Sequence, residues 1–323
     1  MVQVLSISGT IFALIALGWL LVRRGVFNTS ALDVLGAYVV TCALPALIFR
    51  AVSSRPVGET FDAAYLLVLL LTSLGLFGGG YWLLRRAFGC SPTAATFGAM
   101  GMSCANSGFV GYPMLGLALP DLAEHALALN MSFENLVMIP LVLALAEAEK
   151  ARAGGSGTAI APLIARRLAT SPVILALFAG LAVAALRLPL PQVVTGPVNI
   201  VANSSAAVSL VVIGGGLAAL TLRDLGALAW TITAAKLLVM PALAYALLAA
   251  LAALGLTPQP AALGPALLVM TALPAMSIYP VLARRYGEVT TPAAVLLLQT
   301  LVSFVTLTAL LALLGLPQTP AGG

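Results

Sequence analysis

The chain has 323 residues and a formal net charge of +5, and it is 61% hydrophobic but only 8% charged. Soluble domains carry roughly 25% charged residues and disordered chains have low hydrophobicity, so this composition excludes both classes. A polytopic membrane protein remains. Its apolar runs are about 20 residues long, the length of a spanning helix, and they lack the alternation of β-barrel strands. The predicted fold class is therefore all-α.

Turn and charge signals divide the apolar sequence into ten predicted spans. In chain order they cover 5–22, 31–52, 62–84, 93–119, 125–146, 171–188, 196–220, 225–254, 260–285 and 289–315. The longest polar stretch, Lys150 to Thr158, is rich in Gly and Ser and separates five spans from five. We therefore predict a first five-helix repeat at 1–150, a linker at 151–170 and a second repeat at 171–323.

The Lys and Arg residues are distributed unevenly between alternate loops. The loops after odd-numbered spans hold Arg23, Arg24, Arg85, Arg86, Lys150, Arg152, Arg166, Arg167, Arg223, Arg284 and Arg285. The remaining loops and the termini hold only Arg50, Arg55 and Arg187. By the positive-inside rule, we predict an integral protein of the cytoplasmic membrane, with both termini outside and the central linker cytoplasmic. Basic residues scattered in this way predict no nucleic-acid partner.

Two halves of five spans must have opposite orientations, because five is odd. Inverted-repeat transporters have this arrangement. When Tyr112-Pro113 is placed over Tyr279-Pro280, Asp121 meets Glu288. Each half then contains a proline-interrupted span, a short acidic loop and a last span. The shared order supports an inverted repeat better than the few identities do.

The fourth and ninth predicted spans contain helix-weakening residues at corresponding places. Gly108, Gly111 and Pro113 lie in the fourth span, and Pro274 and Pro280 lie in the ninth. Glycine and proline weaken a helix, so both segments are expected to unwind near mid-membrane. Unwound backbone in a bilayer must be covered by protein or water, and paired breaks indicate a transport site. A plain proline kink in each span is the alternative.

Several motifs resemble the auxin efflux carrier family, which includes plant PIN carriers and bacterial malonate and malate permeases. They are the stretch Asn106 to Pro113, the stretch Leu273 to Tyr286, the stretch Leu44 to Phe49, and Lys236 with Pro241. The resemblance covers nearly the whole chain.

This resemblance implies two inverted five-helix repeats in which spans 4 and 9 cross at Pro113 and Pro280. Spans 1, 2, 6 and 7 would form a scaffold, and spans 3–5 and 8–10 a mobile transport domain. The resemblance also implies an elevator-type carrier and a homodimer.

Polar side chains inside the spans are candidate substrate ligands. Asn106 lies beside the first break with Ser103 and Ser107, and Ser277 lies at the second break. An amide can donate to a carboxylate without the cost of burying a charge. The alternative is hydrogen bonding between helices. In the seventh span Asn203 could contact the substrate from the scaffold side.

The fifth span carries Asn130, Glu134 and Asn135. Asn130 and Glu134 are four residues apart, so they share a helix face. Glu134 is the one acid well inside an apolar span, and such residues are functional by default. It could bind the substrate or carry a coupling proton, or it could form a structural pair with Lys236 of the eighth span. Glu134 and Lys236 are therefore the ion-coupling candidates.

These features predict a secondary active transporter of small organic anions, with malonate, malate or auxin-like acids as candidate substrates. The anion would bind where spans 4 and 9 cross, and a proton, sodium or neither could be coupled. The alternative is a cation/proton antiporter on a related crossed-helix fold, with Glu134 and Asn135 at its site. An enzyme is not expected, because the chain has one histidine and no buried Asp pair. No metal spacing or cofactor motif is present.

Overall fold

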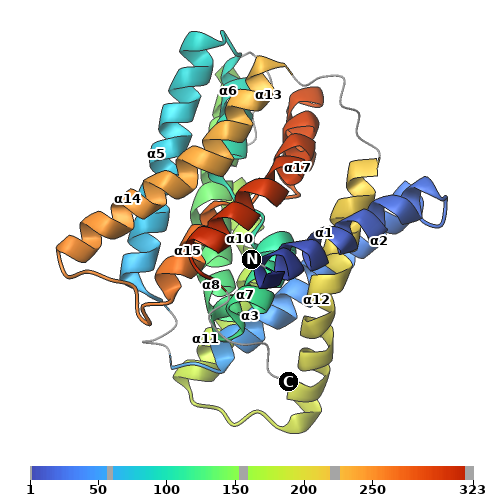
Figure 1. Ribbon diagram of the computed structural model, residues 1–323, viewed down its shortest axis with the longest axis vertical. Helices are drawn as coiled ribbons and strands as arrows, with labels where there is room; N and C mark the ends of the chain where they lie inside the picture. Colours follow the sequence, from blue (N-terminus) through green and yellow to red (C-terminus); the bar gives the residue numbers. More distant parts are fainter. Residues whose placement is uncertain (1, 57–60, 153–158, 219–225, 317–323) are drawn as a thin grey trace.

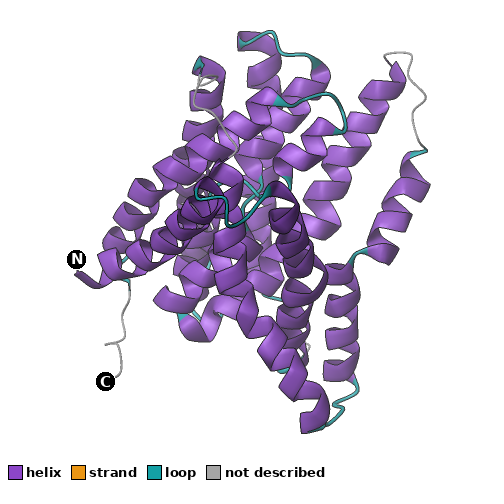
Figure 2. Cartoon of the chain, turned by 90° about the vertical axis from the view of Figure 1, so that its right-hand side faces the viewer, coloured by secondary structure: helices purple, strands orange, loops and turns teal. Residues whose placement is uncertain are grey.

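The computed structural model describes residues 2–56, 61–152, 159–218 and 226–316, and all regular secondary structure in these ranges is helical (Figures 1 and 2). The all-α prediction is therefore confirmed. The Gly- and Ser-rich residues 153–158 of the predicted linker, and Arg223 among the predicted cytoplasmic cations, lie outside the described ranges.

The helices follow one another through short connections, with π-helical turns labelled η. Before residue 153 they are α1 (Val2–Arg23), α2 (Thr29–Tyr38), η1 (Val39–Ala43), α3 (Leu44–Ser53), α5 (Ala63–Ala87), α6 (Pro92–Ser103), η2 (Ser107–Gly111), α7 (Tyr112–Ala118), α8 (Pro120–Phe133), η3 (Glu134–Met138) and α9 (Ile139–Arg152). After residue 158 they are α10 (Ile160–Thr170), α11 (Pro172–Ala185), α12 (Gln192–Ala218), α13 (Ala227–Ala234), η5 (Ala235–Val239), α14 (Met240–Ala253), α15 (Leu263–Thr271), α16 (Tyr279–Arg284) and α17 (Thr290–Leu313).

In the described part of the chain, seven continuous helical segments are long and apolar enough to cross a membrane. An eighth is obtained when α10 and α11, which are bent by 60° relative to each other, are taken as one span. These segments coincide with eight of the predicted spans. The other two, predicted at 93–119 and 260–285, each fall on shorter helical pieces separated by non-helical residues.

Each described π turn is followed, two residues after its end, by a proline. These prolines are Pro45, Pro113, Pro140 and Pro241. A proline has no N–H to donate, and its ring crowds the carbonyl four residues earlier, so a wider turn accommodates it within a continuous helix. Three of the predicted polar site residues, Ser107, Glu134 and Lys236, lie inside these turns.

The helix contacts fall into two groups that also touch each other, through α3 with α8 and through α1 with α17. In the first, α12 contacts α1, α2 and α3, and α11 packs against α3 (Figure 1). In the second, α5 contacts α6 and α14, α8 contacts α7 and α15, and α17 contacts α13 and α16. The first group is held by close backbone approach, because a side chain at Gly18 would collide with the backbone of Val211 and one at Gly214 with that of Ile15. Small residues at helix contacts serve this purpose in membranes.

Candidate functional site

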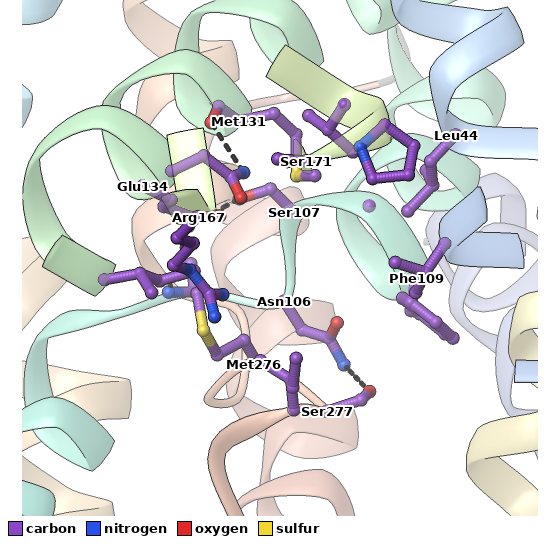
Figure 3. Close-up of a pocket in the computed structure, with 18 of the residues that line it drawn as sticks. Leu44, Asn106, Ser107, Phe109, Met131, Glu134, Arg167, Ser171, Met276 and Ser277 are labelled. Atoms are coloured by element: carbon purple, nitrogen blue, oxygen red, sulfur yellow. Dashed lines mark hydrogen bonds between the residues drawn. The ribbon is translucent and has the colours of Figure 1, made fainter. Parts of the chain in front are cut away.

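Two interruptions of helical structure lie against each other in the centre of the molecule. The first comprises Cys104–Asn106, between α6 and η2, and the second comprises 272–278, between α15 and α16. The Asn106 backbone N–H donates to the Pro274 carbonyl at 2.9 Å. The Asn106 side-chain Nδ2 donates to the Ser277 hydroxyl at 2.8 Å (Figure 3). One residue of the first half therefore joins the two interruptions through both its backbone and its amide.

The interruptions precede Pro113 and Pro280, two of the three prolines at which unwinding was expected. Pro113 lies inside a continuous helical segment, two residues after the end of η2, and Pro280 lies in the first turn of α16. The wider π turn accommodates Pro113 within its helix. Pro280 is well tolerated because the N–H groups of a first turn have no partner in their own helix. Of the three expected crossing prolines, only Pro274 lies in a non-helical segment, where it supplies a carbonyl acceptor.

Gly108 and Gly111 also differ from expectation, because both lie inside η2 rather than in unwound backbone. Their lack of a side chain permits close packing instead. A Cβ at Gly111 would lie 2.6 Å from the Met270 sulfur and 2.7 Å from Leu273 Cδ1. A Cβ at Gly108 would lie 2.8 Å from Leu44 Cδ1. The glycines therefore bring η2 close to α15 and α3.

Each interruption is supported by a side chain from the helix that ends its own half. Glu134 Oε1 accepts hydrogen bonds from the Ala105 backbone N–H at 3.2 Å and the Ser107 hydroxyl at 2.9 Å. Gln299 Oε1 of α17 accepts from the Ala275 backbone N–H at 2.7 Å, and its Nε2 donates to the Gly101 carbonyl at 3.0 Å. Gln299 was not predicted as a site residue. In the sequence it could have been found as a single glutamine within the apolar last span.

A cavity of about 260 Å³ lies beside the first interruption (Figure 3). It is lined by Val40, Leu44, residues 105–109, Met131, Glu134, Asn135, Ile139, Arg167, residues 170–173 and residues 276–278. The lining therefore comes from both helix groups and from the junction of α10 with α11. Most of it is apolar, with a few polar groups, which is the usual character of a small-molecule site.

The structure brings five of the predicted substrate residues to this cavity and leaves three outside its lining. The lining includes Asn106, Ser107, Glu134, Asn135 and Ser277. Their roles in binding stay predictions.

The other three make local contacts. Ser103 Oγ donates to the Ala99 carbonyl of its own helix at 2.8 Å. Asn130 Nδ2 donates to the Tyr65 hydroxyl and to the carbonyl one turn earlier. Asn203 accepts from Arg50 Nη1 at 2.9 Å.

Lys236 and Glu134 bind different partners. The fully buried Lys236 donates from Nζ to the Thr271 carbonyl at 2.7 Å and to the Met240 sulfur at 3.0 Å. Thr271 ends α15, so the ammonium group faces the negative end of a helix dipole. The alternative role predicted for Lys236, an ion pair with Glu134, is not formed in the described residues.

Two arginines near the site have contrasting surroundings. Arg50 of α3 pairs with Glu124 of α8 at 2.7 Å and also contacts Asn203 of α12. Arg167 of α10 lines the cavity and is partly buried. No hydrogen bond or ion pair joins its guanidinium to any residue in the described ranges. Arg167 had been counted only as a linker cation, because the helix that carries it was not expected.

A sequence model of the family described as "Membrane transport protein" matches residues 9–311. The chain belongs to the auxin efflux carrier family. A relative from Rhizobium meliloti (strain 1021), described as "Putative malonate transporter", is 32% identical over 333 aligned residues that cover 99% of each chain. The family predicted from the motifs is thus confirmed, and this auxin efflux carrier homologue is a membrane transporter.

Proposed function

We propose that this member of the auxin efflux carrier family is a secondary carrier of small organic anions. The observation that carries the proposal is a set of groups around one cavity that can donate hydrogen bonds to a carboxylate: Asn106, Ser277 and Arg167. Amide, hydroxyl and guanidinium groups donate to carboxylates, and the charge-assisted bonds are the strongest. The description of the Rhizobium relative, "Putative malonate transporter", names malonate, so malonate is the first substrate to test.

The topology proposed for this carrier has ten spans in two inverted halves of five. The interrupted segments 92–118 and 263–284 would complete the set of candidate spans. Corresponding contacts support the repeat, because Glu134 and Gln299 each accept from an alanine N–H at the interruption of their own half. The proposed orientation follows the Lys and Arg distribution, with both termini outside the cytoplasmic membrane.

An elevator-type motion is the proposed transport mechanism. The group formed by α1, α2, α3, α11 and α12 would be the scaffold, and the other group would carry the anion. The cavity is lined by Leu44 and Val173 from the first group and by Asn106 and Glu134 from the second, so sliding would move the anion relative to the scaffold. Because its rim includes the end of α10, next to the cytoplasmic linker, the proposed conformation is inward-facing. The homodimer implied by the family resemblance would associate through its scaffold.

A cation/proton antiporter is the second candidate, and one observation favours it. The Glu134 carboxylate lines the cavity with Asn135 beside it in η3, and a carboxylate can take up a proton or a cation. Sodium-driven proton movement without an organic anion would favour this candidate. Proton coupling of anion transport through Glu134 is a separate part of the first proposal.

The test is saturable uptake of radiolabelled malonate into proteoliposomes, measured for the wild type, Asn106→Ala and Ser103→Ala. Losing a hydrogen bond to a charged ligand should weaken uptake by Asn106→Ala about tenfold or more. Ser103→Ala is the matched control, because its hydroxyl bonds within its own helix, and it should transport like the wild type. Equal uptake by all three proteins would contradict a site at Asn106, and uptake of no carboxylate by the wild type would contradict the carrier itself.

A further inference from the structure

Arg167 is the only cationic side chain among the described residues that line the cavity. It is held on α10, which has no buried residue of its own and meets α11 at a bend of 60°. Figure 3 shows the Arg167 side chain extending along the cavity from beside Glu134 toward Met276. The helix therefore contributes little to the core but places a guanidinium group at the candidate site.

The charge of this group is unmatched. An arginine stays protonated in proteins, and a partly buried cation requires a partner or solvent. Arg50 has a carboxylate at 2.7 Å, whereas Arg167 has no hydrogen bond or ion pair to any described residue. The Glu134 oxygen that makes hydrogen bonds is occupied by Ala105 and Ser107. An anion entering the cavity would supply the missing partner.

We propose that Arg167 makes this carrier selective for dianions over monoanions, an inference that rests on the proposed function. One carboxylate of a short dicarboxylate would accept hydrogen bonds from Asn106 and Ser277. The second would pair with the planar guanidinium, which matches a carboxylate in two parallel hydrogen bonds. A monoanion has one carboxylate, which cannot pair with Arg167 while it accepts hydrogen bonds from Asn106 and Ser277. Bound to those two residues, it gains nothing from the guanidinium group.

The experiment compares malonate with its monomethyl ester, a monoanion of nearly the same shape. Proteoliposome uptake gives the KM for malonate, and competition gives the inhibition constant of the ester. In Arg167→Gln the malonate KM should rise about tenfold to a hundredfold, because a charge-assisted interaction is lost, while the constant for the ester stays close to its wild-type value. Arg167→Lys keeps the charge but loses the two parallel hydrogen bonds. Its KM for malonate should therefore lie between those of the wild type and Arg167→Gln.

Arg166→Gln is the matched control, because Arg166 is the neighbouring exposed cation on α10 and does not line the cavity. It should keep the wild-type discrimination. Malonate should raise the melting temperature of the wild type and of Arg166→Gln, but raise that of Arg167→Gln much less. This shift in melting temperature reports binding independently of transport. If Arg167→Gln does not fold, the shift is measured on Arg167→Lys instead.

Three results would overturn the inference. Unchanged discrimination in Arg167→Gln shows that the guanidinium does not bind the second carboxylate. Equally weakened binding of malonate and the ester shows that Arg167 maintains the shape of the site but does not distinguish a dianion from a monoanion. Wild-type protein that binds and takes up neither ligand overturns the proposed function together with this inference, whereas the first two results leave anion transport intact.

Discussion

The interruptions at Cys104–Asn106 and 272–278 are alike in backbone and differ in the side chain that supports them. Both use an oxygen from the last helix of their own half to accept an alanine N–H. Gln299 also donates to the Gly101 carbonyl, and it does not line the cavity. Glu134 has no proton to donate when ionised, and it does line the cavity. The second interruption is thus supported by a neutral amide, and the first by a group whose charge a proton can change.

The two halves of the chain are joined by contacts that the first half makes with the second interruption and with α15. The Asn106 backbone and side chain reach the second interruption, and Gly111 of η2 packs against α15. The bonds of Glu134 and Gln299 to alanine N–H groups lie within each half. The contacts of Asn106 and Gly111, and the bond from Gln299 to Gly101, lie between the halves. Gln299 supports an interruption by hydrogen bonding, Gly111 allows close packing, and Glu134 carries a charge that a proton can change. A substitution at each residue tests one of these contributions.

The largest expected effect is for Gln299→Leu. The substitution leaves the Ala275 N–H and the Gly101 carbonyl buried without this partner, and each unsatisfied group costs about 1–3 kcal/mol. We expect a large fall in the melting temperature of purified protein, together with loss of malonate uptake. Thr300→Val is the control, because the Thr300 hydroxyl bonds to its own helix. A wild-type melting temperature for Gln299→Leu would show that the second interruption does not depend on this amide.

Gly111→Ala should have the next largest effect. The new Cβ would meet the Met270 sulfur at 2.6 Å and Leu273 Cδ1 at 2.7 Å, and overpacking of this kind costs about 1–3 kcal/mol. Thermal unfolding should show the loss of stability. Gly116→Ala, one turn further along in α7, has open space around the added methyl group and should be at least as stable as the wild type. If the two variants melt alike, close contact between η2 and α15 is not a determinant of stability.

Glu134→Gln should have the smallest effect on stability and a selective effect on transport. A glutamine oxygen can still accept from Ala105 and Ser107, so the first interruption then resembles the second, and the melting temperature should stay near that of the wild type. If a proton carried by Glu134 is coupled to transport, wild-type malonate uptake should increase when the outside is made acidic, and the variant should lose this response. The pH-gradient dependence of initial uptake rates tests this. An equal response in both proteins would remove Glu134 from proton coupling.

Much of the helical framework could be predicted from the amino acids. A continuous apolar run of spanning length forms a helix in a bilayer, because a helix satisfies every backbone N–H and C=O group within the same segment. Polar loops such as the one after Arg23 therefore marked helix ends to within a few residues. The paired glycine and proline signals located the two interrupted segments and Asn106, but they placed the first break too late in the chain. A proline such as Pro280 has the same local preferences whether it breaks a helix or lies in its first turn.

Apolar length and residue type by themselves determined that this protein is a helical membrane protein, and the resemblance of its motifs indicated the transporter family. The polar residues inside apolar spans identified Asn106 and Glu134 as candidate site residues. Only the tertiary structure decided which polar groups share the cavity. Gln299 is one amide in an apolar helix, and Arg167 is one of many basic residues near a linker. The partners of Gln299 lie far away in the chain, and Arg167 has no hydrogen-bond or ion-pair partner among the described residues. Hydrophobicity is a property of each segment, whereas a hydrogen bond to Ala275 or an unmatched charge beside a cavity exists only after the helices have packed.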